Sequence, residues 1–145
     1  MAKFDLHNNI HTVPLIAPVA ALVNVNTPIV SAIIDTLGYG AVELVLVTGT
    51  NTDADVTFAV TVDEGDASNL AGSNAVAAVD LLGTVAQAGF AFSDDIETRK
   101  IGYVGNRRYV RLTVTPSAND AGSIFLAGVA VLGKPILGPT ANPPQ

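Results

Sequence analysis

The sequence predicts an all-β protein: an antiparallel β-sandwich of jelly-roll type, with about eight strands and extended N- and C-terminal arms. Residues 56–62 and 109–115 alternate apolar and polar side chains with a period of two, which is typical of strands that bury one face. Turn-forming residues recur about every eight to twelve positions, and no long helical pattern interrupts them. Because the chain lacks the Cys–Trp–Cys pattern of antibody domains, the jelly roll is favoured over that fold.

The chain divides into three parts where its composition changes. Its 145 residues suit a single domain with a core of its own, which we place at residues 13–133. Residues 1–12 are polar and lack periodicity, so they are expected to form an N-terminal arm. Residues 134–145 contain four prolines, which cannot pair in a central strand, so a C-terminal tail is expected to run extended.

The strands are expected in two hairpins and several single segments. Residues 41–48 are almost continuously apolar, which is typical of a central strand covered on both faces, and they are expected to form a hairpin with residues 56–62. The other hairpin is expected to have Gly105 and Asn106 in its turn and Pro116 at its end. Further strands are expected at residues 20–25, 29–35, 79–85, 88–92 and 124–132, while residues 67–78 fit either a long loop or a single helical turn.

The composition excludes several classes of function. A net charge of −6 argues against general nucleic-acid binding, and the lack of cysteine excludes disulfides, thiolate zinc sites and cysteine nucleophiles. Residues 8–34 carry no Asp, Glu, Lys or Arg, but prolines and asparagines interrupt them, so neither a membrane span nor a secretory signal is expected. Only 14% of the residues are charged, against about 25% in ordinary domains, so part of the surface is expected to pack against copies or a partner.

A basic segment provides the candidate interface. Five of the seven Lys and Arg residues lie between Arg99 and Arg111, whereas eleven of the thirteen acidic residues lie between Asp35 and Glu97. This separation of charge suits a contact between copies or with an acidic protein surface, since the guanidinium group makes paired contacts with carboxylates. The alternative is a solvated strand face that guards a sheet edge. The candidate interface residues are Arg99, Lys100, Arg107, Tyr109 and Arg111.

No group of residues predicts catalysis, a cofactor or a metal centre. Both histidines, His7 and His11, lie in the expected arm, and there is no Gly-x-Ser-x-Gly motif, so no catalytic residue is assigned and no enzyme is expected. The two histidines could form a metal pair, but no third ligand follows at a matching spacing, which favours two polar residues in a loose leader. Asp53 and Asp55 are followed directly by a predicted strand, and they lack the ligand spacing, the glycine and the closing glutamate of a calcium loop. This favours two solvated acids in a turn.

Three segments resemble a known family. They are VELVLVTGT at residues 42–50, VDEGDAS at 62–68 and TRKIGYVGNRRYVRLTVTP at 98–116. They resemble the capsid decoration, or cement, proteins of tailed bacteriophages, and the resemblance spans residues 41–133. It implies a structural virion protein on the outer capsid surface that binds across neighbouring major capsid subunits. The low charge and the uncharged residues 8–34 predict a dimer or trimer, and no nucleic-acid or membrane partner is expected.

The same features fit two other classes of protein. A phage tail or head-completion component shares the sandwich, the arms and the low charge. A surface module that binds a receptor or a carbohydrate can also be a β-sandwich, but sugar sites stack sugar rings on aromatic side chains, and this chain has no Trp and only three Tyr. The step Arg108-Tyr109-Val110-Arg111 resembles strands of discoidin-type jelly rolls, which implies the sandwich without a ligand site.

Overall fold

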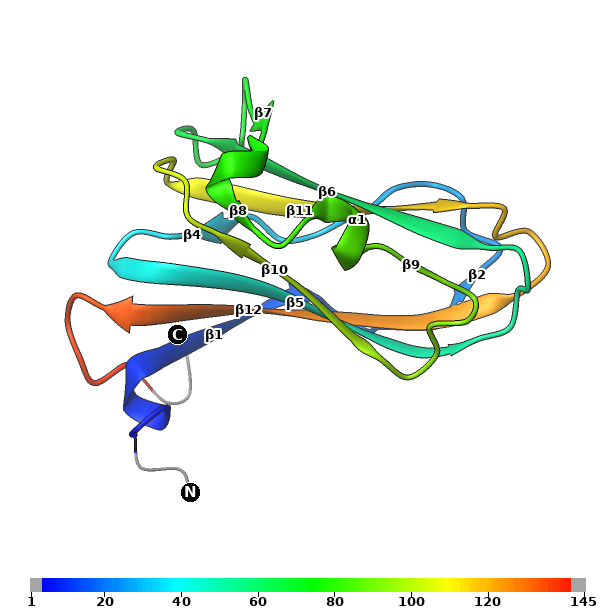
Figure 1. Cartoon of the computed structure of the whole chain (residues 1–145), viewed down its shortest axis with the longest axis horizontal. Helices are drawn as coiled ribbons and strands as arrows, with labels where there is room; N and C mark the ends of the chain where they lie inside the picture. Colours follow the sequence, from blue (N-terminus) through cyan, green and yellow to red (C-terminus); the bar gives the residue numbers. More distant parts are fainter. Residues whose placement is uncertain (1–3, 142–145) are drawn as a thin grey trace.

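The computed structural model describes residues 4–141, which fold into two antiparallel sheets packed as a sandwich (Figure 1). The first sheet contains β1 (Ile10–Ile16), β12 (Ser123–Pro135), β5 (Tyr39–Asn51), β10 (Thr98–Tyr103) and β8 (Leu81–Leu82) in spatial order, with β2 (Leu22–Val23) beside β12. The second sheet contains β3 (Ile29–Val30), β11 (Tyr109–Ser117), β6 (Thr57–Gly65) and β7 (Asn74–Ala75), with β4 (Ile34–Asp35) on β11 and β9 (Phe90–Ala91) on β6. Helical structure within residues 4–141 is limited to η1 (His7–Asn9), η2 (Ala78–Asp80) and α1 (Val85–Ala88).

The connections between the strands follow the jelly-roll order. Along the chain, β1, β5, β10 and β12 of the first sheet alternate with β3–β4, β6 and β11 of the second, and β7 and β9 lie beside β6. As a result β12 lies between β1 and β5, and β11 lies between β3–β4 and β6. The long strands of the first sheet thus have the order β1-β12-β5-β10, and the second sheet has β3–β4, β11, β6 and then β7 and β9. Two four-stranded sheets connected in this order form the two Greek keys of a jelly roll. The structure therefore confirms the predicted all-β sandwich of jelly-roll type.

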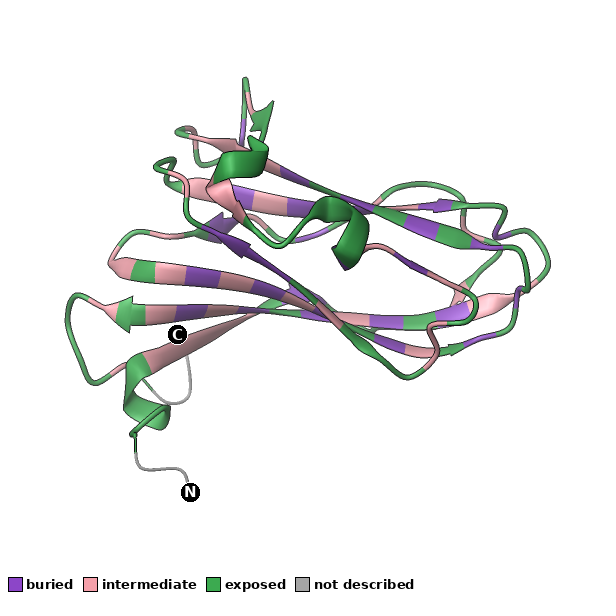
Figure 2. Cartoon of the chain, in the orientation of Figure 1, coloured by how far each residue is buried: buried purple, intermediate pink, exposed green. Residues whose placement is uncertain are grey.

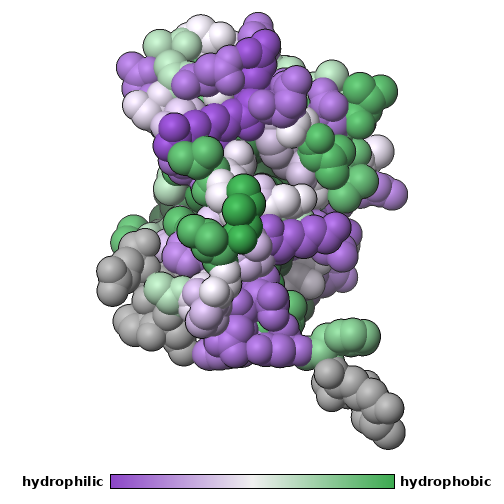
Figure 3. Space-filling model, turned by 90° about the vertical axis from the view of Figure 1, so that its left-hand side faces the viewer, coloured by the Kyte–Doolittle hydropathy of each residue, from purple (hydrophilic) through white to green (hydrophobic). Residues whose placement is uncertain are grey.

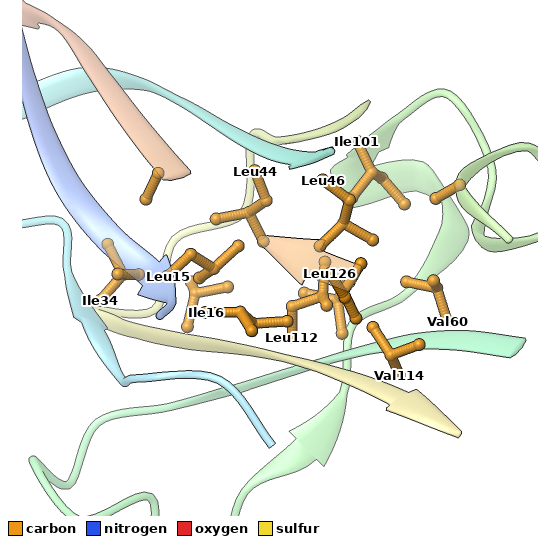
Figure 4. Close-up of a cluster of buried hydrophobic side chains, with 14 of the residues drawn as sticks. Leu15, Ile16, Ile34, Leu44, Leu46, Val60, Ile101, Leu112, Val114 and Leu126 are labelled. Atoms are coloured by element: carbon orange, nitrogen blue, oxygen red, sulfur yellow. The ribbon is translucent and has the colours of Figure 1, made fainter. Parts of the chain in front are cut away.

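The core lies between the sheets and is formed by the inward positions of the alternating strands. Figure 2 shows this alternation as bands of buried residues along β5, β6, β11 and β12. Val110, Leu112 and Val114 are fully buried, which confirms the predicted inward side of that strand. Aliphatic side chains from both sheets meet in this core (Figure 4), and the rings of Phe58 and Phe90 stack with centroids 4.4 Å apart. The core between the two sheets is therefore filled mainly by Val, Leu and Ile side chains.

The structure contradicts the hairpin predicted around Gly105 and Asn106. β10 pairs with β5 and β8 in the first sheet, whereas β11 pairs with β6, β3 and β4 in the second. Neither Gly105 nor Asn106 has the positive φ that a two-residue hairpin turn requires. Residues 104–108 cross between the sheets instead, because β10 and β11 find long partners in β5 and β6, and a local turn signal carries no information about such distant partners.

The hairpin predicted from residues 41–48 and 56–62 is wrong for the same reason, since β5 and β6 lie in opposite sheets. The expectation that β5 is covered on both faces is also contradicted. Its inward residues Val42, Leu44 and Leu46 are buried, but the outward residues Val45 and Val47 are only partly covered. A run of apolar residues therefore makes one face of the core here, and leaves a second apolar face on the outside of the sandwich.

Several element boundaries also differ from the sequence prediction. β1 begins at Ile10, so the last three residues of the predicted arm pair with β12. β12 continues to Pro135, so the first two residues of the predicted tail belong to this strand, and Pro135 lies opposite Tyr39 of β5. Pro116 lies inside β11 instead of ending it. A proline is tolerated there because β3 ends opposite Val114, which leaves β11 with β6 as its one paired neighbour at that point. Residues 1–3 and 142–145 lie outside the described residues.

The remaining predicted strands are present only as short segments. The regions 20–25, 79–85 and 88–92 each contain one two-residue strand, β2, β8 and β9 respectively. The region 29–35 splits into β3 and β4, which both pair with β11. Between them, the Ser31 amide donates to the Leu112 carbonyl and the Ala32 amide donates to the Leu15 carbonyl, so this segment bridges the two sheets. The strand predicted at 124–132 is present within β12, but only its inward side is buried, since Phe125 and Val129 are exposed.

Candidate functional site

The structure separates the five predicted interface residues instead of gathering them on one face. Arg99 and Lys100 lie on β10 in the first sheet, whereas Tyr109 and Arg111 lie on β11 in the second. Arg107 precedes β11 in the crossing segment. Because the hairpin that would have joined them is absent, the five residues do not form a continuous basic surface.

Each arginine of this segment is already paired with an acidic residue of the same chain. Arg99 binds Asp94 and Glu97 at 2.9 Å each, and Arg111 lies 3.5 Å from Asp63. Two further ion pairs join Arg107 to Asp66 and Arg108 to Asp35, and the Arg108 guanidinium also lies 5.0 Å from the centre of the Tyr109 ring. The acidic and basic segments of the sequence therefore neutralise each other within the fold. Lys100 forms no ion pair within residues 4–141.

A buried tyrosine connects the two sheets, and sequence reasoning did not identify it. The hydroxyl of Tyr103 on β10 donates to Glu64 on β6 at 2.5 Å, and it accepts the Arg107 amide at 2.9 Å. Burial, together with the hydrogen bond to Glu64, raises the pKa of Tyr103 above its ordinary value. A side chain at Gly105 would collide with this ring, since a Cβ there would lie 2.5 Å from the hydroxyl oxygen. The network holds the crossing segment in place.

Three carboxylates meet where β5 ends: Asp53, Asp55 and Asp120 offer oxygens within 4.8 Å of one another, the one such group of possible metal ligands in the described chain. Asp53 was expected to be a solvated turn acid, but it is buried, because it accepts the amides of Asp120 and Ala121 at 3.0 and 2.8 Å. These bonds, the Ala121 amide first, lower the pKa of Asp53, while the side-chain interaction with Asp53 raises the pKa of Asp55. The cluster is explained by its role in fixing the loop that precedes β12.

The two histidines, for which a metal pair was only the less favoured alternative, are not brought together as a metal site. His11 belongs to β1, where its ring stacks on Tyr39 with the centroids 5.6 Å apart. His7 lies in η1 at the start of the described chain. No candidate metal group in residues 4–141 contains either histidine.

Exposed apolar side chains gather where the chain begins and ends. We call this surface the terminal end and define it by Phe4, Leu6, Leu37, Ile136 and Leu137, all of which are exposed. The Ile136 amide donates to the Gly38 carbonyl at 2.8 Å, and Thr140 donates to the carbonyls of Asn8 and Ile10, so the two ends of the chain lie together (Figure 1). Figure 3 looks onto this end and shows hydrophobic side chains in the middle of the face, with hydrophilic ones above and below. A hollow of about 310 Å³ opens beside Leu37, Ile136 and Leu137.

A second apolar surface covers the outer side of the first sheet. We call it the valine face and define it by Val45 and Val47 on β5 and by Phe125, Ala127, Val129 and Val131 on β12. These residues point away from the core, and Phe125, Val47 and Val129 are 55%, 42% and 38% exposed. The nearly unbroken apolar run of β5 was the sequence signal for this surface, although it was interpreted as a strand buried on both sides.

Comparisons with known proteins provide no assignment. No family model and no curated protein sequence matches the chain. Among solved structures, the chain is similar to a family two carbohydrate esterase from Cellvibrio japonicus, with 14% sequence identity and a TM-score of 0.33 over 91% of this chain. The match spans 36% of the esterase chain, and a likeness at this TM-score carries no argument about function. None of the described helices is long and apolar enough to cross a membrane.

Proposed function

We propose that the protein is a structural virion component that decorates and stabilises a bacteriophage capsid by binding across neighbouring major capsid subunits on the outer surface. The proposal is supported by the resemblance of residues 42–50, 62–68 and 98–116 to capsid decoration proteins. It assigns the protein no catalysis and no cofactor. Its partners are the major capsid protein and further copies of itself, without a nucleic-acid or membrane partner.

The observation that carries the proposal is the terminal end. Large apolar side chains there remain in water, with Ile136 at 78% and Leu137 at 86% exposed, and burial of apolar area contributes about 25 cal/mol per Å². The first and last described segments lie together here, since Thr140 donates to Asn8 and Ile136 donates to Gly38, so both border the apolar residues Leu37, Ile136 and Leu137. Such a surface fits another protein better than a small ligand, because it is exposed and shallow.

Attachment through the terminal end would depend little on salt. The arginines that the sequence predicted as the interface already bind internal carboxylates, so an acidic partner would have to displace Asp63, Asp66 or Asp94 before it could bind them. Apolar contacts need no such exchange, and they are not screened by ions. The two ways of attachment therefore differ in their response to ionic strength and to substitution.

The test uses capsids that lack the protein, mixed with the purified chain and examined by sedimentation and electron cryomicroscopy. We expect binding in many regular copies over the shell, nearly unchanged between low and high salt. The double change Ile136→Asp with Leu137→Asp is expected to abolish binding, whereas Val19→Asp, at an equally exposed apolar residue in the loop after β1, is expected to preserve it. A few copies at a single vertex would instead identify a tail or connector component.

The double change Arg107→Glu with Arg111→Glu tests the arginine interface separately. If the terminal end makes the contact, this variant binds capsids as the unmodified chain does. The opposite result would be a folded Arg107→Glu, Arg111→Glu protein that does not attach, together with attachment of the unmodified chain that depends strongly on salt. It would show that the basic residues make the contact and would overturn the role of the terminal end.

A further inference from the structure

The valine face is apolar across neighbouring strands of the first sheet. In the register of β5 and β12, Val45 lies opposite Val129 and Val47 lies opposite Ala127. On the other side of β12, Pro14 of β1 lies opposite Val129 and Thr12 lies opposite Val131. The apolar residues therefore form a continuous surface over β1, β12 and β5.

The outer face of the second sheet provides a comparison, because its outward residues are mostly polar, as expected for a face in contact with water. Its outward positions on β6 and β11 are mostly polar: Thr113 lies opposite Thr61, and Arg111 lies opposite Asp63 and binds it. Antiparallel sheets with one face in water normally alternate in this way, apolar inward and polar outward. The first sheet departs from the rule on its outer face alone, which indicates that this face is covered when the protein functions.

The size of the valine face suits a modest protein interface. Strands lie about 4.8 Å apart and rise about 3.4 Å per residue, so the three strands β1, β12 and β5 and the nine residues from Phe125 to Gly133 span about 10 Å by about 27 Å. This footprint is similar to the largest apolar patches of ordinary monomers, which are often functional. Two such footprints together cover less than the roughly 1,200 Å² that stable specific complexes bury, so only a weak, reversible association is expected.

Two charged residues lie on this outer face, Glu43 on β5 and Lys100 on β10. They are close in the sheet, because Glu43 lies opposite Gly102, two residues along β10 from Lys100, and its carboxylate lies over Gly102. Neither forms an ion pair within residues 4–141, although all the arginines do. The face therefore presents one unpaired acid and one unpaired base at the border of an apolar surface.

We infer that the valine face binds the valine face of a second copy of this chain in a two-fold arrangement. In the sheet, Val129 is in register with Val45 and Lys100, and Val131 is in register with Glu43 and Gly102. A two-fold axis that is perpendicular to the strands and passes midway between these two rows places each row over the other row of the partner subunit. It brings Glu43 to the height of Lys100 of the partner subunit, one strand spacing aside, and it does so twice, as an isologous interface requires. The same operation places Val129 over Val131 of the partner subunit. Two reciprocal ion pairs then border an apolar centre.

Charge also selects this face for contact between copies. The chain has a net charge of −6, so two copies repel each other over most of their surfaces. The outer face of the first sheet carries one acid and one base, and it continues into the uncharged residues 8–34 at β1. This inference goes beyond capsid decoration, since it names a different surface and concerns the isolated protein.

The experiment is sedimentation equilibrium of the purified full chain from micromolar to millimolar concentration. We expect a reversible dimer. The variant Val129→Asp is expected to weaken dimerisation at least tenfold, because each new carboxylate is then buried against Val131 of the partner subunit, while its β-sheet circular dichroism spectrum stays unchanged because Val129 points outward. The matched control Thr113→Asp adds the same charge to the outer face of the second sheet and should dimerise as the unmodified chain does.

A charge exchange tests the pairing of Glu43 with Lys100. Each single change, Glu43→Lys or Lys100→Glu, should weaken the dimer, and the double variant should restore it. A chain that stays monomeric at all concentrations overturns the inference, as does a Val129→Asp protein that dimerises normally. If the chain is monomeric and Val129→Asp abolishes capsid binding, the face belongs to the capsid. Capsid attachment is measured separately, so failure of the dimer leaves the role of the terminal end standing.

Discussion

Tyr103 shows how one side chain secures the connection between the sheets. Its ring belongs to the core of the first sheet, while its hydroxyl donates to Glu64 of the second sheet and accepts the amide of Arg107. Through these two hydrogen bonds the hydroxyl attaches the crossing segment, residues 104–108, to both sheets.

Replacing Tyr103 with Phe removes the hydroxyl and keeps the ring. We expect the free energy of unfolding to fall by about 1–3 kcal/mol, because the Glu64 carboxylate and the Arg107 amide lose their partner in a partly buried site. Urea unfolding followed by circular dichroism measures this change. The control is Tyr109→Phe, whose hydroxyl forms no hydrogen bond within residues 4–141, and which should change stability by less than about 0.5 kcal/mol. Equal effects of the two changes would refute the role of the Tyr103 hydroxyl.

At the scale of elements, an ion pair attaches β4 to the start of β11. Asp35 lies opposite Tyr109, and the Arg108 guanidinium donates to both of its oxygens at 2.9 and 2.7 Å. β4 has only two residues, so its own ladder is short. The side-chain pair therefore supports a strand that would be weakly held by backbone bonds alone.

This pair predicts a specific dependence of stability on pH. The hydrogen bonds from Arg108 lower the pKa of Asp35 in the folded chain. A lowered folded pKa stabilises the fold above the ordinary carboxyl pKa of about 3.9, and this contribution is lost as the pH falls through the lowered value. Asp35→Asn should therefore be slightly less stable than the unmodified chain at pH 7, and the difference should shrink as the pH falls below the ordinary carboxyl pKa. Denaturant unfolding of both proteins across this range checks it, and a difference independent of pH would contradict it.

At the scale of the whole molecule, residues 4–9 and 136–141 lie together, and none of these twelve residues is buried. Ile136 and Thr140 bind back through hydrogen bonds to Gly38, Asn8 and Ile10. Lys134 and Pro135 belong to β12, so the separable part of the predicted tail starts after Pro135. The sandwich and the terminal end are therefore separable in experiment.

Removal of residues 136–145 should leave a folded sandwich that no longer binds capsids. The loss of three surface hydrogen bonds is expected to cost about 1–3 kcal/mol, which leaves the β-sheet circular dichroism spectrum unchanged. Attachment should be lost, because Ile136 and Leu137 leave with the tail. Cosedimentation with capsids and thermal unfolding measure the two properties. A truncated chain that does not fold would place the tail in the core.

The sequence alone determined the fold class and the inward side of the main strands. Alternation in residues 56–62 and 109–115 is a local property, because successive side chains of a strand point to opposite faces, and it placed Val60 and Val114 in the core correctly. The apolar run of β5 was located correctly as a strand, but its coverage on both faces was predicted wrongly, because Val45 and Val47 are left on the outside of the sandwich. These predictions needed no knowledge of which strand pairs with which.

The tertiary structure decided the pairing of strands and everything that depends on it. Gly105 and Asn106 fit a tight turn locally, but β10 and β11 each gain a longer partner elsewhere, and the free energy of a full ladder outweighs a turn preference. The same long-range pairing gave the arginines internal acids to bind, brought Asp120 to Asp53, and left Val45 and Val129 on one uncovered surface. Contacts between residues far apart in the chain produce these features, and period and composition carry no record of such contacts.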